Sequence, residues 1–367
     1  MTNENNQTSK YSAVKIYIFI VDLILSFLGI VIFQFFLSRT ISNYSLHYGN
    51  NFYCSTALYL SYFMYFMYFI SFPIRFGSSF LVEKKFGLSN QTLKAWIYDE
   101  IKSIILTFII CLSAGEIFYL ILRNFKLWWL IISIIWIIFS IVFAKIFPVV
   151  IVPLFFKYLP LDNPELKSKI FALGKKSGIK LLDVSKINLS SKTKKTNAAL
   201  VGLGGTRRII LADTLTDKFT TDEVLSVVAH EFAHHKYAHM SKLLIFISAA
   251  TICSFFCVSL VIEKISVLIG AVNIYDLYLF PMLLLFITCF NLLIQPIFNA
   301  FSRILERSAD EFALMVTDDP ASFISMMEKL ALSNLSEKSP SLLKKILFYD
   351  HPPIAERIML AQKYSVH

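Results

Sequence analysis

The chain has 367 residues, of which 56% are hydrophobic and only 16% are charged. A soluble domain normally carries roughly a quarter charged residues, so this composition excludes an ordinary soluble protein and predicts an integral-membrane one. The net charge is +10, but Lys and Arg lie mainly between long apolar runs. Such a distribution of basic residues is typical of a membrane protein, in which it sets the orientation in the bilayer. The expected partner is therefore a lipid bilayer and no nucleic acid.

Long apolar runs dominate the sequence. A membrane-spanning helix needs about 20 mainly apolar residues. The sequence predicts about six such spans, at residues 16–37, 53–72, 103–122, 127–147, 243–262 and 277–298. Basic residues gather in alternate connecting segments, so the positive-inside rule puts both termini and the long segment after span four in the cytoplasm.

The polar segment between spans four and five has its own predicted elements. Residues 164–176 are typical of a helix, and residues 184–189, 198–203 and 207–212 are typical of short strands. Gly204 and Gly205 lie between the last two strands and indicate a hairpin. Thr220 and Glu223 have the spacing of a capping box, which predicts a helix that begins there.

This helix carries the sequence His230-Glu231-Phe-Ala-His234, an HExxH motif. Four helical residues advance about 400°, so the two histidines share one face and can bind a single zinc ion. Glu231 is then suited to deprotonate a zinc-activated water. His235 and His239 are interpreted as surface residues or as neighbours of the ligands rather than as ligands themselves.

A catalytic zinc ion keeps three protein ligands and one open position. The predicted third ligand is Glu306, on a helix that follows the last span. Asp310 lies four residues later on the same face and is expected to accept the free N–H of a ligand histidine and to assist in proton transfer. The alternative is that Glu306 forms a structural ion pair with Arg303 or Arg307.

Further motifs lie outside the zinc helix, at residues 80–92, 152–161, 196–199, 208–215 and 350–358. Together with the HExxH motif they resemble the type I CAAX prenyl protease family of integral-membrane zinc metalloendopeptidases. The resemblance extends from about residue 53 to residue 360. It implies a ring of helices around an intramembrane chamber, with the zinc site facing inward near the cytoplasm.

The resemblance also implies roles for three residues outside the two zinc helices. Asn197, on an edge strand, is expected to hold the substrate backbone. His351 and Arg357 are expected to stabilise the developing oxyanion. Two features differ from the usual family pattern. The chain has about six spans instead of the usual seven, and Ala199 replaces the aromatic residue that often follows the Asn-Ala pair at 197–198. The second difference resembles the pattern of bacterial-type relatives.

The sequence therefore predicts a mainly α-helical membrane protein with two domains. Residues 1–156 form a transmembrane domain, and residues 157–367 form a cytosol-facing α+β zinc metallopeptidase domain, gluzincin-like, that contains the last two spans. The expected cofactor is one Zn²⁺. The expected substrate is a peptide or protein, C-terminally lipidated in the family case, and the bacterial plasma membrane is favoured over the endoplasmic reticulum.

Two other functions remain open at this point. A heat-shock-type quality-control protease of the same wider group would cleave misfolded membrane proteins. A non-enzymatic transporter or scaffold would use a structural zinc ion, and intramembrane polar residues such as Asp22 and Glu116 would line its pathway. Three ligands beside a potential base favour catalysis over a structural site, which is more often closed by four ligands.

Overall fold

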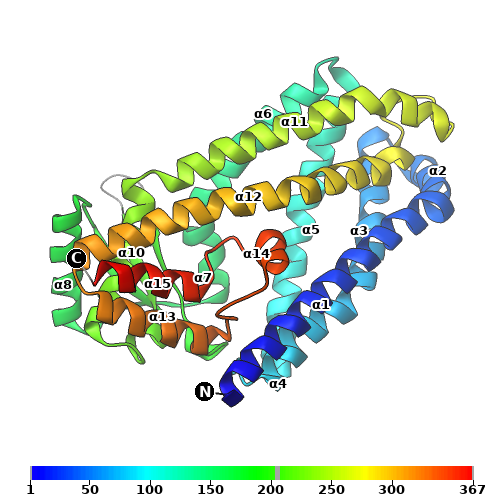
Figure 1. Cartoon of the computed structure of the whole chain (residues 1–367). Coiled ribbons are helices and arrows are strands. Elements are labelled where there is room, and N and C mark those ends of the chain that lie inside the picture. Colours follow the sequence, from blue (N-terminus) through cyan, green and yellow to red (C-terminus); the bar gives the residue numbers. More distant parts are fainter. Residues whose placement is uncertain (1, 203–206, 366–367) are drawn as a thin grey trace.

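The computed structural model describes residues 2–202 and 207–365. Its longest helices come from the apolar runs (Figure 1). They are α1 Thr2–Ile32, α2 Ser38–Tyr48, α3 Phe52–Phe76, α5 Leu93–Asn124, α6 Trp128–Ile146, α11 His239–Leu268 and α12 Phe280–Thr317. Six helical stretches in the described residues are long and apolar enough to cross a membrane, which confirms the predicted number of spans.

The helices are longer than the predicted apolar runs, because helix formation continues through the polar residues at their ends. Single turns of π-helix extend several of them, at η1 Phe33–Leu37, η2 Gly77–Val82 and η3 Phe147–Ile151. The short helices α4 Glu83–Lys85 and α7 Val152–Phe155 follow two of these turns. The hydrophobic pattern alone did not predict the π-turns, which insert one extra residue without changing the apolar character.

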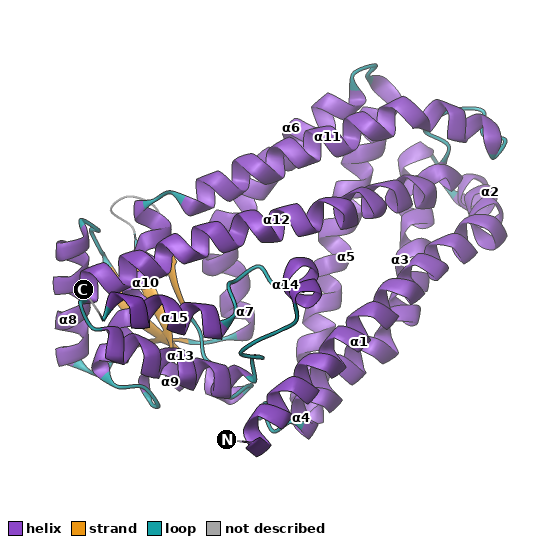
Figure 2. Cartoon of the chain, viewed as in Figure 1, coloured by secondary structure: helices purple, strands orange, loops and turns teal. Residues whose placement is uncertain are grey.

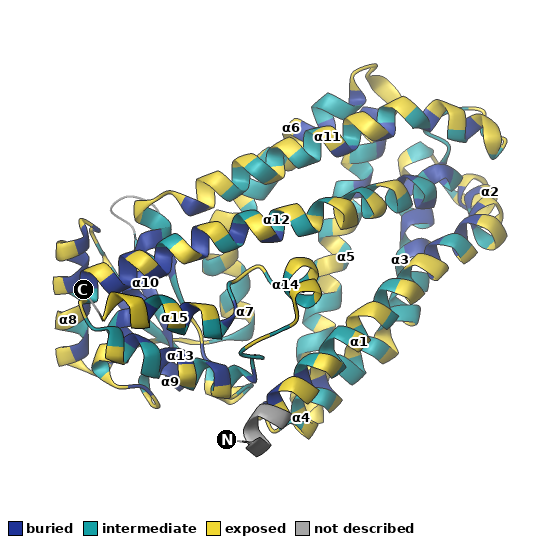
Figure 3. Ribbon diagram, in the orientation of Figure 1, coloured by how far each residue is buried: buried dark blue, intermediate teal, exposed yellow. Residues whose placement is uncertain are grey.

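Many apolar side chains on the long helices face outward. Phe36, Phe69 and Leu293 are between 73% and 76% exposed. Figure 3 shows that the exposed and half-buried positions extend along these helices, whereas the buried positions gather at their ends and in one lobe. Apolar surface on this scale is stable against lipid and not against water.

Most of the remaining elements form a compact lobe around a small sheet (Figure 2). Its helices are α8 Pro164–Ser177, α9 Asp213–Thr216, α10 Thr221–Lys236, α13 Pro320–Asn334 and α15 Ile354–Tyr364. Its strands are β1 Tyr158–Pro160, β2 Asp183–Ile187, β3 Ala198–Val201 and β4 Arg208–Ala212. Helix α14 Leu342–Phe348 lies apart from the lobe, beside α12. The described residues also include two 3₁₀ turns, η4 Leu189–Ser191 and η6 Leu277–Leu279.

The strand order is β1-β2-β4-β3, with β2 and β4 parallel and the other two pairs antiparallel. The predicted hairpin is therefore present as β3 and β4, and its predicted glycine turn lies outside the described residues. The predicted helix at 164–176 is also present. Strand β1 was missed because three residues that end in a proline carry almost no strand pattern. Strand β3 lies at one edge of the sheet.

Helix α10 lies at the centre of the lobe core. Its Val228 and Phe232 are fully buried in a cluster with Ile209 of the sheet, Phe312 of α12 and Phe323 of α13. Apolar contact on several sides fixes the rotation of α10 about its own axis. The polar face of the helix is consequently held toward α12, where the predicted third ligand lies.

Candidate metal centre

The zinc-motif helix begins at a complete capping box, as the sequence predicts. The Glu223 amide donates to Thr220 Oγ1 at 3.3 Å, and the Thr220 amide donates to Glu223 Oε2 at 2.8 Å. Lys329 and Ser325 of α13 also donate to the buried Glu223 carboxylate, at 2.7 and 2.6 Å. This anchor fixes the start of α10 two turns before His230.

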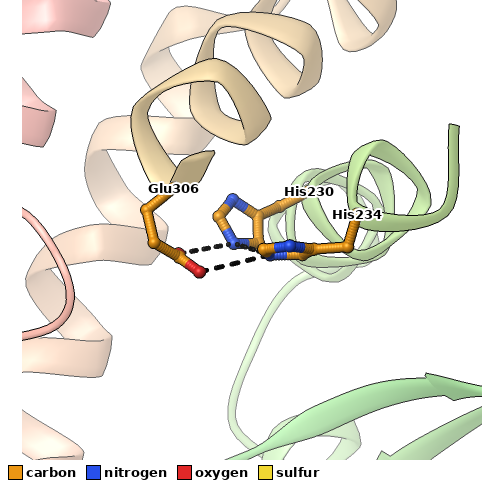
Figure 4. A group of neighbouring side chains, drawn as sticks. All are labelled: His230, His234 and Glu306. Carbon is orange, nitrogen blue, oxygen red and sulfur yellow. Dashed lines mark hydrogen bonds and ion pairs between the residues drawn. The ribbon is translucent and has the colours of Figure 1, made fainter. Parts of the chain in front are cut away.

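Two imidazoles and one carboxylate converge between α10 and α12 (Figure 4). His230 Nε2 lies 3.1 Å from His234 Nε2 and 3.2 Å from Glu306 Oε2. His234 Nε2 lies 3.4 Å from Glu306 Oε1. Ligands at 2.0–2.1 Å from one tetrahedral zinc ion are roughly 3.3 Å apart, so these spacings match a zinc site.

The Glu306 carboxylate has the environment of a metal ligand. Its Oε2 is buried and makes no hydrogen bond with any described residue. A buried carboxylate oxygen is costly without a neutralising partner, and a cation between the imidazoles would provide one. Neither arginine of the alternative ion pair is available: Arg303 donates to main-chain carbonyls of residues 345 and 349, and Arg307 pairs with Glu311.

Asp310 holds the other side of the His230 ring. Its Oδ1 lies 2.9 Å from His230 Nδ1, and Arg357 donates from Nε to its Oδ2 at 2.7 Å and from Nη2 to its Oδ1. All three side chains are buried. The contact directs His230 Nε2 toward His234 and Glu306, as the sequence predicts for the Asp310 carboxylate.

The two histidines differ in their electrostatic surroundings. Burial alone would lower the pKa of His230, but the Asp310 and Glu306 carboxylates that its ring contacts raise it to about 9. Burial and the neighbouring His230 lower the pKa of His234 to about 4. The site therefore has one imidazole that attracts a proton or a cation, and one that stays neutral with a free nitrogen.

Glu231 and His351 lie beside the candidate ligands. Burial raises the pKa of the Glu231 carboxyl, and the Glu306 carboxylate raises it further. His351 begins the turn before α15, and its Nε2 lies 3.4 Å from Glu306 Oε2. Its Nδ1 lies 2.8 Å from Asp350, and its side chain remains 54% exposed. His351 is thus open toward any ligand that approaches the cluster.

Asn197 precedes the exposed edge strand β3. Its side-chain Oδ1 accepts from the Ala198 amide at 2.9 Å, and its main-chain carbonyl accepts from Ala212 of β4. Further along, the Leu200 carbonyl lies 3.1 Å from His235 Nε2 and is therefore already paired with α10. The open part of the edge is limited to its first residues.

Of the two interpretations that the sequence left open for His239, a surface residue or a neighbour of the ligands, the structure shows the second, because His239 is buried against His234. The sequence did not predict the next contact, with Ser308. His239 Nδ1 lies 3.1 Å from His234 Nδ1, and Ser308 Oγ lies 3.1 Å from His239 Nε2. Ser308 lies two residues after Glu306, on the helix that carries the third candidate ligand. A polar residue so close in sequence to a proposed metal ligand was the signal that could have identified Ser308 as part of the site.

Both parts of the chain match family models. Residues 160–365 match the model described as Peptidase family M48, and residues 2–157 match the one described as CAAX prenyl protease N-terminal, five membrane helices. Within residues 2–157, all described by the structure, there are four candidate spans rather than five. The expected departure in span number is therefore present in this chain.

Several relatives resemble most of the chain. Uncharacterized metalloprotease YhfN of Bacillus subtilis is 32% identical and covers 77% of this chain and 67% of its own length. CAAX prenyl protease 1 of Saccharomyces cerevisiae is 30% identical, with coverages of 79% and 68%. The crystal structure of Ste24p from S. mikatae has a TM-score of 0.88 at 25% identity and covers 98% of this chain and 89% of that one.

Proposed function

Because the chain belongs to peptidase family M48 and is an integral-membrane metalloendopeptidase, we propose that His230, His234 and Glu306 hold one zinc ion. The observation that carries the proposal is the set of ligand-atom separations of 3.1, 3.2 and 3.4 Å in a family that depends on zinc in general. Membership of a peptidase family also argues against the alternative of a non-enzymatic transporter or scaffold.

Each neighbouring side chain has a role in this proposal. A bound zinc ion supplies Lewis acidity, which polarises the scissile carbonyl and makes water a stronger nucleophile. Glu231 takes the proton of the attacking water and returns it to the leaving amine, with Asp310 close enough to the ligand shell to assist. His351, with its exposed ring, donates to the oxyanion that develops on the carbonyl.

Arg357 is proposed to act through Asp310. Its Nε and Nη2 both donate to that carboxylate, and only 9% of the residue is exposed. Positive charge at this point still favours an oxyanion nearby, as the family resemblance implies. The direct contact with Asp310 supports a second effect, which is to keep the carboxylate ionised and aimed at His230.

We propose that the substrate peptide binds as an added strand at the start of the β3 edge, with the Asn197 side chain holding the substrate backbone. Strand addition supplies main-chain hydrogen bonds and is a recognised mode of peptide binding. The pairing of Leu200 with His235 supports a short contact rather than a long one. The rest of the affinity must come from contacts outside this strand.

The proposed substrate class is a C-terminally lipidated peptide, on the basis of relatives named CAAX prenyl protease 1. The Lys and Arg distribution supports a cytoplasmic catalytic domain with both termini on that side, and no role for nucleic acid. The Bacillus relative supports a bacterial plasma membrane. The proposed division of the chain is a transmembrane domain at 1–156 and a metallopeptidase domain at 157–367.

The test uses purified protein in detergent with three peptides of one sequence: prenylated, palmitoylated and unmodified, plus a misfolded membrane protein. Native protein is expected to carry one zinc ion per chain and to cleave the lipidated peptides faster than the unmodified one. Glu231→Gln should keep the zinc ion and lose cleavage. Cleavage of the misfolded protein alone would favour the quality-control alternative, and cleavage by Glu231→Gln would refute the role of this residue.

A further inference from the structure

The two candidate histidine ligands are supported in different ways. A metal-bound imidazole needs a partner on its second nitrogen, because that contact fixes the tautomer and the ring orientation. For His230 the partner is the Asp310 carboxylate. For His234 it is another imidazole, His239, whose Nδ1 lies 3.1 Å from His234 Nδ1. His239 is almost completely buried and begins helix α11.

The contacts beyond His239 form a chain with a defined direction. His239 Nε2 lies 3.1 Å from Ser308 Oγ, and Ser308 Oγ donates to the Leu305 carbonyl at 2.7 Å. Since the Ser308 hydrogen is used on Leu305, Ser308 must accept from His239. His239 therefore carries its hydrogen on Nε2, and its Nδ1 is an acceptor.

This direction determines the tautomer of His234. Because His239 Nδ1 is the acceptor, the hydrogen of this bond must lie on His234 Nδ1. His234 Nε2 is then left with a free lone pair. That lone pair faces His230 Nε2 and the Glu306 carboxylate, at 3.1 and 3.4 Å. The chain of hydrogen bonds thus produces the one neutral tautomer of His234 that can bind a metal ion at the site.

The backbone near His239 supports this role. Ala238 has φ of 52°, in the left-handed region that residues with a Cβ rarely adopt. This conformation ends α10 and lets the chain turn at once into α11, so that His239 lies against His234. Ser308 comes from α12, two residues beyond Glu306. Three helices therefore meet at one hydrogen-bonded chain.

We propose that His239 and Ser308 are positioning residues that fix the tautomer and orientation of His234. The proposal rests on the zinc site described above and extends it to side chains that touch neither metal nor substrate. The support is uncharged, in contrast to the Asp310–Arg357 pair behind His230. Loss of such a partner typically weakens metal binding by about 10- to 100-fold.

Two amide variants of His239 separate positioning from simple packing. In His239→Asn, the amide oxygen lies near the place of Nδ1 and can accept from His234. In His239→Gln, the amide reaches the place of Nε2, keeps the contact with Ser308 and leaves His234 without its acceptor. Ser308→Ala removes the far end of the chain. His235→Ala is the matched control, since His235 contacts the Leu200 carbonyl and no candidate ligand.

The experiment measures zinc affinity of the full-length protein in detergent, after metal removal, by competition with a chromophoric chelator. The absorption spectrum of the Co²⁺-substituted protein reports ligand geometry, and the Tm of the metal-free protein reports folding. His239→Gln should lose about 10- to 100-fold in affinity with an altered Co²⁺ spectrum. His239→Asn and His235→Ala should stay within a few-fold of the native value, and Ser308→Ala should lie between.

Native affinity in both His239→Gln and Ser308→Ala would overturn the proposal. Equal losses in the Asn and Gln variants would also overturn it, because packing alone would then explain the effect. If His239→Gln does not fold, Ser308→Ala decides, with native affinity as the contrary result. A native protein that binds no zinc would instead refute the proposed metal centre, and a native protein that binds zinc without cleavage would refute only the proposed reaction.

Discussion

Removal of the negative charge at Asp310 should be among the most damaging single changes outside the ligands. Asp310→Asn keeps the shape of the side chain but leaves the Arg357 guanidinium buried without its counter-ion. Asp310 is fully buried and Arg357 is 9% exposed, so solvent cannot replace the lost partner. Breaking a buried pair in this way costs about 3–5 kcal/mol, which corresponds to a fall in Tm on the order of 5–10 °C.

The same substitution should weaken zinc binding, because His230 Nδ1 loses a charged acceptor at 2.9 Å. A loss of about 10- to 100-fold is expected. Thermal unfolding in detergent and chelator competition measure the two effects separately. Glu311→Gln is the matched control on the same helix: its partner Arg307 is exposed, and exposed ion pairs contribute little.

A double-mutant cycle tests the physical reason. Arg357→Met alone removes the counter-ion of Asp310, and the double variant Asp310→Asn/Arg357→Met removes both charges together. Because no unpaired charge remains, the double variant should regain much of the Tm lost in Asp310→Asn. Additive losses in the double variant, or a native Tm in Asp310→Asn, would refute the explanation.

Three further predictions concern the metal, the oxyanion donor and the acid stability of the lobe. A zinc chelator should abolish cleavage, and added Zn²⁺ should restore it; activity that persists after verified metal removal would contradict the zinc mechanism. His351→Ala should keep the zinc ion but lower kcat by about 10²–10³-fold, whereas an unchanged kcat would remove His351 from the reaction. Although burial opposes it, Lys329 and Ser325 lower the pKa of Glu223 below its ordinary value of 4.5. The ionised carboxylate therefore stabilises the fold above that value and loses its effect as the pH falls through the folded pKa, so Glu223→Gln should lower Tm at neutral pH and differ little from native protein in acid.

The sequence predicted local features well. Apolar runs of about 20 residues gave the number of spans, and the spacing of His230, His234 and Thr220–Glu223 was sufficient to predict the zinc-motif helix and its start. These patterns depend on helical geometry over a few residues, which the sequence expresses directly. The family and its peptidase activity are likewise confirmed.

Long-range pairings were harder to predict. The bond from Arg357 to Asp310 joins residues 47 positions apart, and the contact of Ser308 with His239 joins residues 69 apart. No periodic pattern links such positions, because their proximity depends on how α10, α11, α12 and α15 pack. The roles of Asn197 and His351 came only from the family resemblance and stay predictions.

Helix α12 has a consequence for any attempt to obtain the catalytic machinery as a water-soluble fragment. This one helix of 38 residues starts as a membrane span and carries Glu306, Ser308 and Asp310 in its last third, before it ends at Thr317. At 1.5 Å per residue it is about 57 Å long, and no loop separates its lipid-facing part from its functional end. A fragment limited to the hydrophilic lobe would require a cut within this continuous helix. A truncated enzyme without its last two spans would therefore lose the helical segment that holds the Glu306 and Asp310 carboxylates in place.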